Sequence, residues 1–333
     1  MFVCPGCVRS ISSHFHNASV SDFILRTGSI ELSRRPHRTQ RSRLGAVTQR
    51  ARGFSGLRSL NCSSEPSGTP TPSDDTGGNP GGASQSPKYR VEELLAWLNS
   101  PDPTTRLRAV IACRQLSADE AAPVLERAIR MNDPEIQNRS FAAIALGYLP
   151  NKRSYELLSG LLRNDTAGEV RSSAAAALGY LGERRALPEL RLALLEDIHW
   201  STRVSAAVSL GLLQDERAFD VLVDGLRLSR RYKGEEGNAL KRACLGSLGE
   251  LGMPQAVSHL VFYAQEHDFL TRQVLAEALG RLLHRARRLD NDRTTQRQLT
   301  LARECLEYLA RDDHANVRRA AQMALANLSL VVE

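Results

Sequence analysis

The sequence predicts an all-α protein in which residues 88–333 form an α-solenoid of about seven helix pairs. The main observation is a repeat: the segment EVRSSAAAALGYL at 169–181 has copies 32 residues to either side, which end at Leu149 and Leu213. Weaker copies end at Leu116, Leu251, Leu282 and Leu328. A fixed period between about 20 and 50 residues is typical of solenoids. Only 5% of the residues are aromatic, as expected where thin helical layers pack through small side chains. No apolar run approaches the ~18 residues that a membrane-spanning helix needs, so no membrane span is predicted.

Residues 1–62 are predicted to be a transit peptide. Residues 1–60 contain ten Ser and ten Arg, no Lys, and only Asp22 and Glu31 as acidic residues. An Arg- and Ser-rich, acid-poor start is typical of organelle transit peptides. The first eight residues have no charged side chain, and a smooth amphipathic helix is hard to draw there. This favours the chloroplast stroma as the destination, with the mitochondrial matrix as the alternative.

Residues 63–87 are predicted to be a disordered linker. Ser, Pro, Gly or Thr occupies 19 of these 25 positions, and no large apolar side chain occurs. Such a segment cannot bury enough surface to offset the entropy that it loses on ordering.

The helical pattern begins near residue 89. Apolar residues at 91, 94, 95 and 98 follow the i, i+3, i+4, i+7 spacing of a helix with one apolar face. The run Ser-Pro-Asp-Pro at 100–103 ends that helix, and a second helix is expected from Thr104 to Leu116. First helices are expected at 91–98, 119–130, 151–163, 184–195, 215–228, 253–265 and 296–310. Second helices are expected to end at Leu116, Leu149, Leu181, Leu213, Leu251, Leu282 and Leu328. Longer connections are expected at 228–239 and 284–295.

Each second helix repeats one pattern of large and small residues. The reference position is the Leu at 146, 178, 210, 248, 279 and 325, with Cys113 in the first unit. The residue before it is Ala or Ser in every unit, and the residue after it is Gly at 147, 179, 211, 249 and 280. Because Gly in a helix interior costs up to about 1 kcal/mol, we expect the backbone of a neighbouring helix to approach closely there.

A charge pattern accompanies this packing pattern. An acid and then a base precede the reference position at fixed spacings, except in the first unit, which has Ser100 and Arg106. The pairs are Asp133 with Arg139, Asp165 with Arg171, Asp197 with Arg203, Glu235 with Lys241, Glu266 with Arg272, and Asp312 with Arg318. The acid is expected in the turn, where it can cap the second helix, and the base can reach the acid of its own or a neighbouring unit. Since a catalytic pair need occur only once, this recurrence predicts a structural ladder.

The Val-Arg-x-x-Ala-Ala-x-Ala-Leu-Gly-x-Leu pattern at 170–181, its copy at 138–149 and the short repeat period resemble HEAT-like repeats of the short phycobilin-lyase subclass. That subclass occurs in phycobilin lyase subunits and in phycobilisome-degradation proteins. The resemblance covers residues 90–333 and implies a HEAT-like α-solenoid. It leaves function open, because its motif residues are the packing and ladder positions themselves.

No catalytic, metal or cofactor site is predicted. Deoxyhypusine hydroxylases have a similar fold and bind di-iron through repeated His-Glu pairs, but this chain contains no His-Glu dipeptide. It also lacks a Gly-rich phosphate loop, a nucleophile elbow and an HExxH motif. The resemblance alone leaves a bilin or other tetrapyrrole as a candidate ligand.

The charge distribution disfavours nucleic acid as a partner. Residues 1–87 hold ten Arg and five acidic residues, so the remaining chain holds 34 basic and 32 acidic residues and is nearly neutral. Two basic clusters accompany the longer connections and favour an acidic protein partner. They are Arg227, Arg230, Arg231, Lys233, Lys241 and Arg242, and Arg281, Arg285, Arg287, Arg288 and Arg293.

The sequence therefore favours a non-catalytic, protein-binding scaffold or assembly factor in the plastid. Its partner surface is expected on the concave face formed by the second helices. The predicted surface residues are Tyr148, Tyr180, Arg242, Glu250, Gln273, Glu277, Arg281 and Arg319. The alternative is a bilin lyase or lyase subunit. Tyr148 and Tyr180 occupy the same repeat position and could stack side by side on one surface, or they could be ordinary half-exposed tyrosines of a helix.

Overall fold

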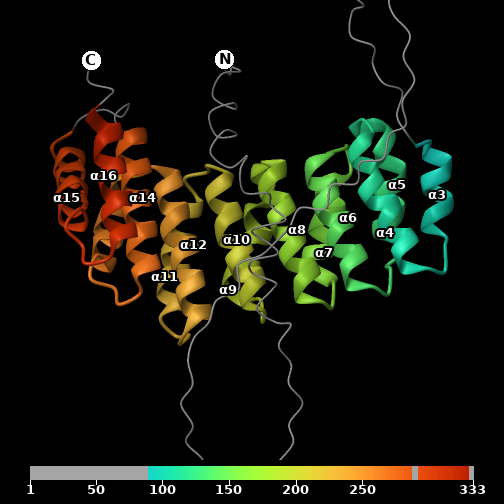
Figure 1. Ribbon diagram of the computed structural model, residues 1–333, viewed down its shortest axis with the longest axis horizontal. Coiled ribbons are helices and arrows are strands. Elements are labelled where there is room, and N and C mark those ends of the chain that lie inside the picture. Colours follow the sequence, from blue (N-terminus) through green and yellow to red (C-terminus); the bar gives the residue numbers. More distant parts are fainter. Residues whose placement is uncertain (1–88, 287–291, 330–333) are drawn as a thin grey trace, which may run out of the picture. The chain divides into compact units, whose positions relative to one another are not determined.

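The computed structural model describes residues 89–286 and 292–329, so the predicted transit peptide and linker lie outside the described residues. Within those ranges the chain forms fourteen α-helices and no strand. Successive helices lie side by side in chain order (Figure 1). The prediction of an all-α solenoid is confirmed.

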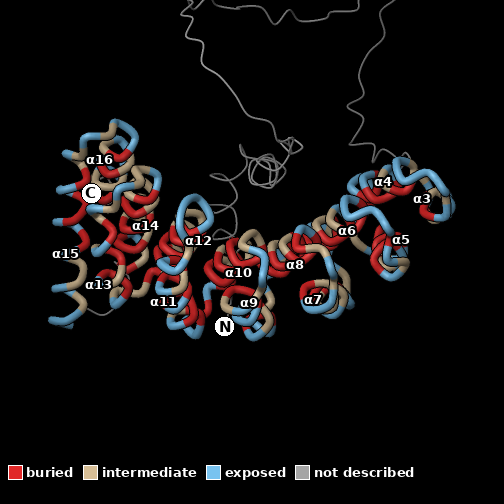
Figure 2. The backbone as a smooth tube through the Cα atoms, turned by 90° about the horizontal axis from the view of Figure 1, so that it is seen from below, coloured by how far each residue is buried: buried red, intermediate tan, exposed pale blue. Residues whose placement is uncertain are grey.

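The helices form two layers, with the first helix of each pair in one layer and the second helix in the other. The pairs are α3 (Val91–Leu98) with α4 (Pro103–Ala112), α5 (Ala118–Arg130) with α6 (Ile136–Tyr148), α7 (Ser154–Asn164) with α8 (Gly168–Leu181), α9 (Leu187–Glu196) with α10 (Trp200–Leu212), α11 (Ala218–Ser229) with α12 (Glu235–Leu251), α13 (Val257–Leu260) with α14 (Phe269–Ala286), and α15 (Arg293–Leu309) with α16 (Ala315–Ser329). Within this described part, the second helices line the concave side of a curved row (Figure 2).

Three predicted elements differ in the structure. The connection expected at 284–295 is shorter, because α14 runs to Ala286 and α15 begins at Arg293. The first helix expected at 253–265 consists of a 3₁₀ turn, the short helix α13 and a second 3₁₀ turn. Its buried residues Val257, Leu260 and Tyr263 recur at every third position, which is the period of a 3₁₀ helix. The connection expected at 228–239 is shorter than predicted, because α12 already begins at Glu235. Gly234 adopts a φ of +77° before it.

Close contacts between glycines and small residues join neighbouring second helices. In each case the Gly after the reference Leu faces the small residue before the reference Leu of the next unit. The pairs are Gly147 with Ala177, Gly179 with Ser209, Gly211 with Ser247, Gly249 with Ala278, and Gly280 with Ala324. This arrangement confirms the close approach that the glycines predict.

A recurring geometry of charged residues also joins each unit to the next. Arg139 Nε and Nη2 donate to the Asp165 carboxylate of the following unit at 2.8 and 2.9 Å. Its Nη1 donates to the carbonyl oxygen of Asp133, in the turn of its own unit, at 2.6 Å. The same bidentate ion pair to the following unit occurs in Arg106–Asp133, Arg171–Asp197 and Arg272–Asp312, and Lys241 lies 3.1 Å from Glu266. Arg318, in the last unit, donates only to the carbonyl oxygens of residues 312 and 313 among the described residues.

The acids do not cap the second helices as predicted. The Asp133 carboxylate accepts from the backbone N–H of Glu135, and Glu135 is itself the N-cap residue of α6. Asp165 and Asp197 accept from Ala167 and His199 in the same way. These carboxylates therefore close the turn just before the helix, one step earlier than a capping side chain.

The ladder is interrupted between α10 and α12. Glu235 lies in the first turn of α12 instead of the preceding turn, and it pairs with Arg242. Arg203 donates to the carbonyl oxygens of Asp197 and Leu195, and its guanidinium lies 5.4 Å from the ring centroid of Tyr232. Glu235 is therefore not part of the ladder that the sequence predicts, whereas Lys241 is, because it reaches Glu266 of the following unit. The reason that Glu235 is left out is that α12 starts early enough to make residue 235 helical.

Candidate functional site

The concave face has an apolar half, which lies on α4, α6, α8 and α10. Most of its residues lie two positions before or two positions after the reference position. These positions are on the side of the helix that faces away from the core. Tyr148 and Tyr180 are 52% and 45% exposed there, and Ile111 is 44% exposed. We call this surface the apolar stripe; it consists of Ile111, Phe141, Ile144, Tyr148, Tyr180, Val208 and Leu212.

The two tyrosines of the apolar stripe are stacked. Their ring centroids lie 5.3 Å apart at an interplanar angle of 22°. Burial, with a smaller contribution from Tyr148, raises the pKa of Tyr180 to about 12, and burial also raises the pKa of Tyr148. Both phenols are therefore neutral near pH 7. They present flat apolar faces with polar tips, a combination that is favoured at interfaces.

Arginines lie at the α4 end of the apolar stripe. Arg108 is on α4 and Arg114 is in the 3₁₀ turn that follows it, and both are exposed. No ion pair joins either of them to another described side chain. Burial raises the pKa of the Tyr148 phenol, and Arg114 is close enough to offset part of that effect by favouring the ionised form. The end of the stripe is therefore positively charged.

The other half of the concave face, on α12 and α14, is charged but internally paired. Glu250 lies 2.9 Å from Arg281 and 2.9 Å from Arg285, while the Gln273 amide donates to Glu277 at 3.1 Å. Arg242 lies 2.8 Å from Asp268. Arg242, Glu250, Gln273, Glu277 and Arg281 were predicted to be exposed, and the structure leaves them partly exposed. Opposite charges at i, i+4 on α14 and across to α12 neutralise one another. Arg319, on α16, is exposed as predicted.

Tyr148 and Tyr180 were predicted as surface residues, but the rest of the apolar stripe was not. The signal was present in the repeat alignment. The position two before the reference is Ile111, Ile144, Ala176 and Val208 in the first four units, but Gly246 and Glu277 in the next two. This change was not noticed, because the repeat is defined by its packing positions, and the position two before the reference is not one of them.

The described side chains form no recognisable metal centre. No group of three or more His, Cys, Asp or Glu residues within 89–286 and 292–329 is placed to hold a metal ion. None of the helices described is both long enough and apolar enough to cross a membrane.

Comparison with known proteins gives a family match over part of the chain. Residues 91–179 and 162–233 match the model of HEAT repeats. No curated protein sequence matches the chain. Among solved structures, human deoxyhypusine hydroxylase in complex with glycerol shares 20% identity over 72% of this chain and 96% of its own, with a TM-score of 0.32.

Two further solved structures are similar to this chain. The complex of CpcE and CpcF of phycocyanin lyase from Nostoc sp. PCC7120 shares 21% identity over 76% of this chain and 92% of that chain, with a TM-score of 0.39. A designed armadillo repeat protein shares 17% identity over 72% of this chain and 100% of its own, with a TM-score of 0.38. Residues 91–233 therefore consist of HEAT repeats, and stacked helix pairs continue the same architecture through the other described residues.

Proposed function

We propose that this protein is a non-catalytic scaffold or assembly factor that binds a protein partner on the apolar stripe. The apolar stripe is the observation that carries the proposal. Soluble monomers seldom expose contiguous large apolar side chains across several neighbouring elements unless a partner covers them. In solenoids, the concave surface formed by successive units is a common binding surface.

The chemistry of the apolar stripe favours an amphipathic segment with acidic residues at one end. Ile111, Tyr148 and Tyr180 offer apolar area, whereas Arg108 and Arg114 offer unpaired positive charge at the α4 end. The charged half contributes less to affinity, because its carboxylates and arginines already pair with one another. From the Arg- and Ser-rich start of the chain, we place the interaction in the chloroplast stroma, with the mitochondrial matrix as the alternative.

A bilin or other tetrapyrrole is the second candidate ligand, and with it a bilin-lyase activity. The stacked Tyr148 and Tyr180 rings offer a flat aromatic surface, and Arg114 offers a cation for a propionate group. The two candidates differ in one simple property, because only the tetrapyrrole absorbs visible light.

The test is affinity capture from plastid stroma with the full chain and two double variants. Tyr148→Ser with Tyr180→Ser removes the stacked pair from the apolar stripe. Leu192→Ser with Ile198→Ser is the matched control, since these side chains are 51% and 86% exposed on α9 and in the turn after it. Captured proteins are identified by mass spectrometry, and the visible spectrum of each eluate is recorded.

The scaffold proposal expects a stoichiometric protein that the wild type and the control variant capture and the tyrosine variant does not. Circular dichroism of all three proteins checks that the helices are intact. A coloured eluate that loses its colour in the tyrosine variant would support the tetrapyrrole instead. Equal capture by all three proteins would exclude the apolar stripe as the binding surface.

A further inference from the structure

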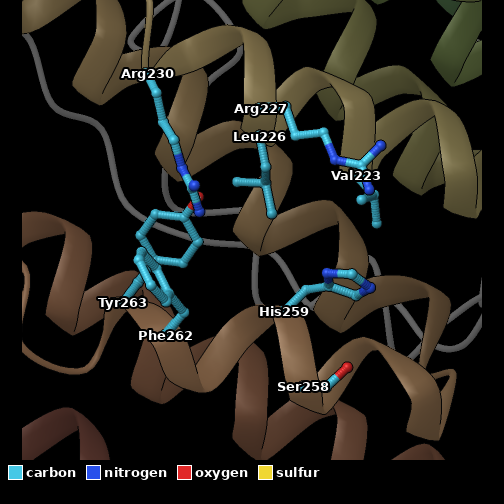
Figure 3. A pocket seen from close by; sticks show the side chains of 8 residues that line it. All are labelled: Val223, Leu226, Arg227, Arg230, Ser258, His259, Phe262 and Tyr263. Carbon is cyan, nitrogen blue, oxygen red and sulfur yellow. The ribbon is translucent and has the colours of Figure 1, made fainter.

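The outer layer has a pocket between α11 and α13, where the repeat is least regular. Figure 3 shows the side chains that line this pocket, whose volume is about 160 Å³. Val223 and Leu226 of α11 supply apolar walls, and Arg227 and Arg230 project from the same side. His259 and Phe262 lie opposite, on the segment that contains α13. The pocket has room for a single amino-acid side chain.

Arg230 is held in a fixed orientation but is not neutralised. Its guanidinium carbon lies 4.6 Å from the ring centroid of Phe262. Its Nε and Nη2 lie 3.4 and 3.3 Å from the Tyr263 hydroxyl oxygen, which accepts from them. Tyr263 is only 2% exposed, so it provides a buried, rigid support. None of the acidic side chains described forms an ion pair with Arg230.

Arg227 provides a second cation one turn earlier on α11. It is paired with Asp224 at 2.8 Å, and both side chains are largely exposed. Such an exposed pair is weak and exchanges readily with another carboxylate. The pocket therefore has, on the same side, one guanidinium without an ion pair to a described side chain and one with a weak, exposed ion pair.

Phe262 adds an exposed apolar surface directly beside the free cation. The Phe262 side chain is 68% exposed, although the neighbouring Tyr263 is buried. Residues 261–263 form a 3₁₀ turn, which has three residues per turn. Leu260 and Tyr263, three residues apart, are therefore both buried, and Phe262 between them faces outward. The break in the repeat thus leaves an aromatic ring at the surface beside the pocket.

We propose that this pocket binds a short acidic peptide segment of a protein partner, with one apolar side chain between Leu226 and Phe262 and adjacent carboxylates on Arg230 and Arg227. The small volume fits one aliphatic side chain, and a guanidinium is suited to bidentate pairing with a carboxylate. A single-stranded nucleic acid needs a succession of exposed rings and a continuous basic track, and this pocket offers one exposed ring. The site is in the opposite layer from the apolar stripe and does not depend on it.

The test uses the full chain and fluorescein-labelled peptides in a fluorescence anisotropy titration. The probe has the sequence Glu-Glu-Leu-Glu-Glu, and the control peptide replaces Leu by Ser. The pocket variants are Arg230→Ala and Phe262→Ala. Their matched controls are Arg231→Ala, an exposed arginine in the same turn that does not line the pocket, and Leu192→Ala, an exposed apolar residue of α9.

We expect each pocket variant to weaken binding of the Leu peptide by roughly tenfold, the size of one lost charge-assisted hydrogen bond or apolar contact. The control variants are expected to bind like the wild type, and added salt is expected to weaken binding. Equal binding by Arg230→Ala and Arg231→Ala would overturn the proposal. Equal binding of the Leu and Ser peptides would also overturn it, because the site would then recognise charge alone.

Arg230→Lys provides a further check that preserves the net charge. Lysine lacks the planar fork that stacks on Phe262 and donates to the Tyr263 hydroxyl. Weaker peptide binding by this variant would support the geometric role of Arg230. Full binding would overturn it, since a point charge would then be sufficient.

Discussion

Gly147 of α6 lies directly against Ala177 of α8: a Cβ on Gly147 would be 2.8 Å from the Ala177 Cβ and 2.9 Å from its Cα. Atoms this close cannot be accommodated without moving one of the helices. The same relation between a glycine and a small residue recurs at the next four junctions between second helices. Glycine is thus required here for space, in a helix where its backbone freedom is a disadvantage.

We therefore predict that Gly147→Ala lowers the free energy of unfolding by about 1–3 kcal/mol, the usual cost of overpacking. Gly160→Ala is the matched control, because Gly160 is also inside a helix but a Cβ there has no neighbour within 4 Å. It is expected to raise the free energy of unfolding by about 0.5–1 kcal/mol. Urea denaturation measures both. If Gly147→Ala were as stable as Gly160→Ala, the close packing of α6 on α8 would be disproved.

These contacts show why so much of the fold could be predicted. Gly147 and Ala177 occupy fixed places in two successive repeat units, so a local pattern specifies a contact between units. The ladder was less predictable, because a base at a fixed spacing can reach either of two acids. The structure takes Arg139 to the next unit because its other guanidinium edge binds the turn of its own unit. The two 3₁₀ turns within 254–263 were not predicted, because no residue of the repeat pattern marks them.

Removing a ladder carboxylate should be costly. In Asp133→Ala, Arg106 loses both charge-assisted hydrogen bonds while its side chain is only 10% exposed. Leaving a buried charge without its partner typically costs about 3–5 kcal/mol. Asp224→Ala breaks an exposed pair with Arg227 and should cost less than about 1 kcal/mol. Thermal and urea denaturation of the two variants check the difference, and equal losses would contradict a stabilising role for the ladder.

The interruption at Arg203 predicts an asymmetry between two similar substitutions. Arg171→Met would leave the Asp197 carboxylate, 9% exposed, without its ion pair. Arg203→Met would leave only two carbonyl oxygens without donors, since Arg203 binds no carboxylate of the described residues. We expect Arg171→Met to be more destabilising by about 2 kcal/mol or more. The measurement is the difference in denaturation midpoints at equal m-values, and a larger loss for Arg203→Met would contradict the pairing.

The ladder also predicts loss of stability in acid. Burial alone would raise the pKa of Asp133, but hydrogen bonds from Arg106 and Asn138 outweigh it and lower the pKa from 3.8 to about 2. Because this pKa is lower in the folded state, the unfolded chain binds the proton first as pH falls. The stabilisation is therefore complete above about pH 4 and is lost as pH falls through about 2. Asp165, Asp197 and Asp312 have lowered pKa values as well.

For Asp133 alone, the lowered pKa contributes about 2 kcal/mol to the free energy of unfolding at neutral pH. Urea denaturation of the wild type and of Asp133→Asn at a series of pH values measures it. The two proteins are expected to differ most above pH 4 and to converge toward pH 2, because the protonated Asp133 resembles Asn. A difference that is constant over this range would show that Asp133 does not have a lowered pKa.

The candidate site was only partly predictable, because sequence spacing does not show which charged side chains pair with one another. Helix phase placed Arg281 and Arg319 on the same concave face, but it could not show which charges pair. Arg281 lies 2.9 Å from Glu250 and 4.0 Å from Glu277, whereas Arg319 is exposed and has no ion pair with a described side chain. Glu250 and Arg281 lie on different helices, α12 and α14, so the phase of one helix does not predict their pairing.

This difference predicts unequal effects on stability for two charge reversals. Arg281→Glu would add a third carboxylate beside Glu250 and Glu277, and we expect it to lower the free energy of unfolding by about 1 kcal/mol, since these side chains are partly exposed. Arg319→Glu is expected to leave stability unchanged within about 0.5 kcal/mol. Urea denaturation measures the stability, and partner capture is measured with the same proteins. If Arg319→Glu weakens capture at unchanged stability, the concave surface of α16 takes part in binding.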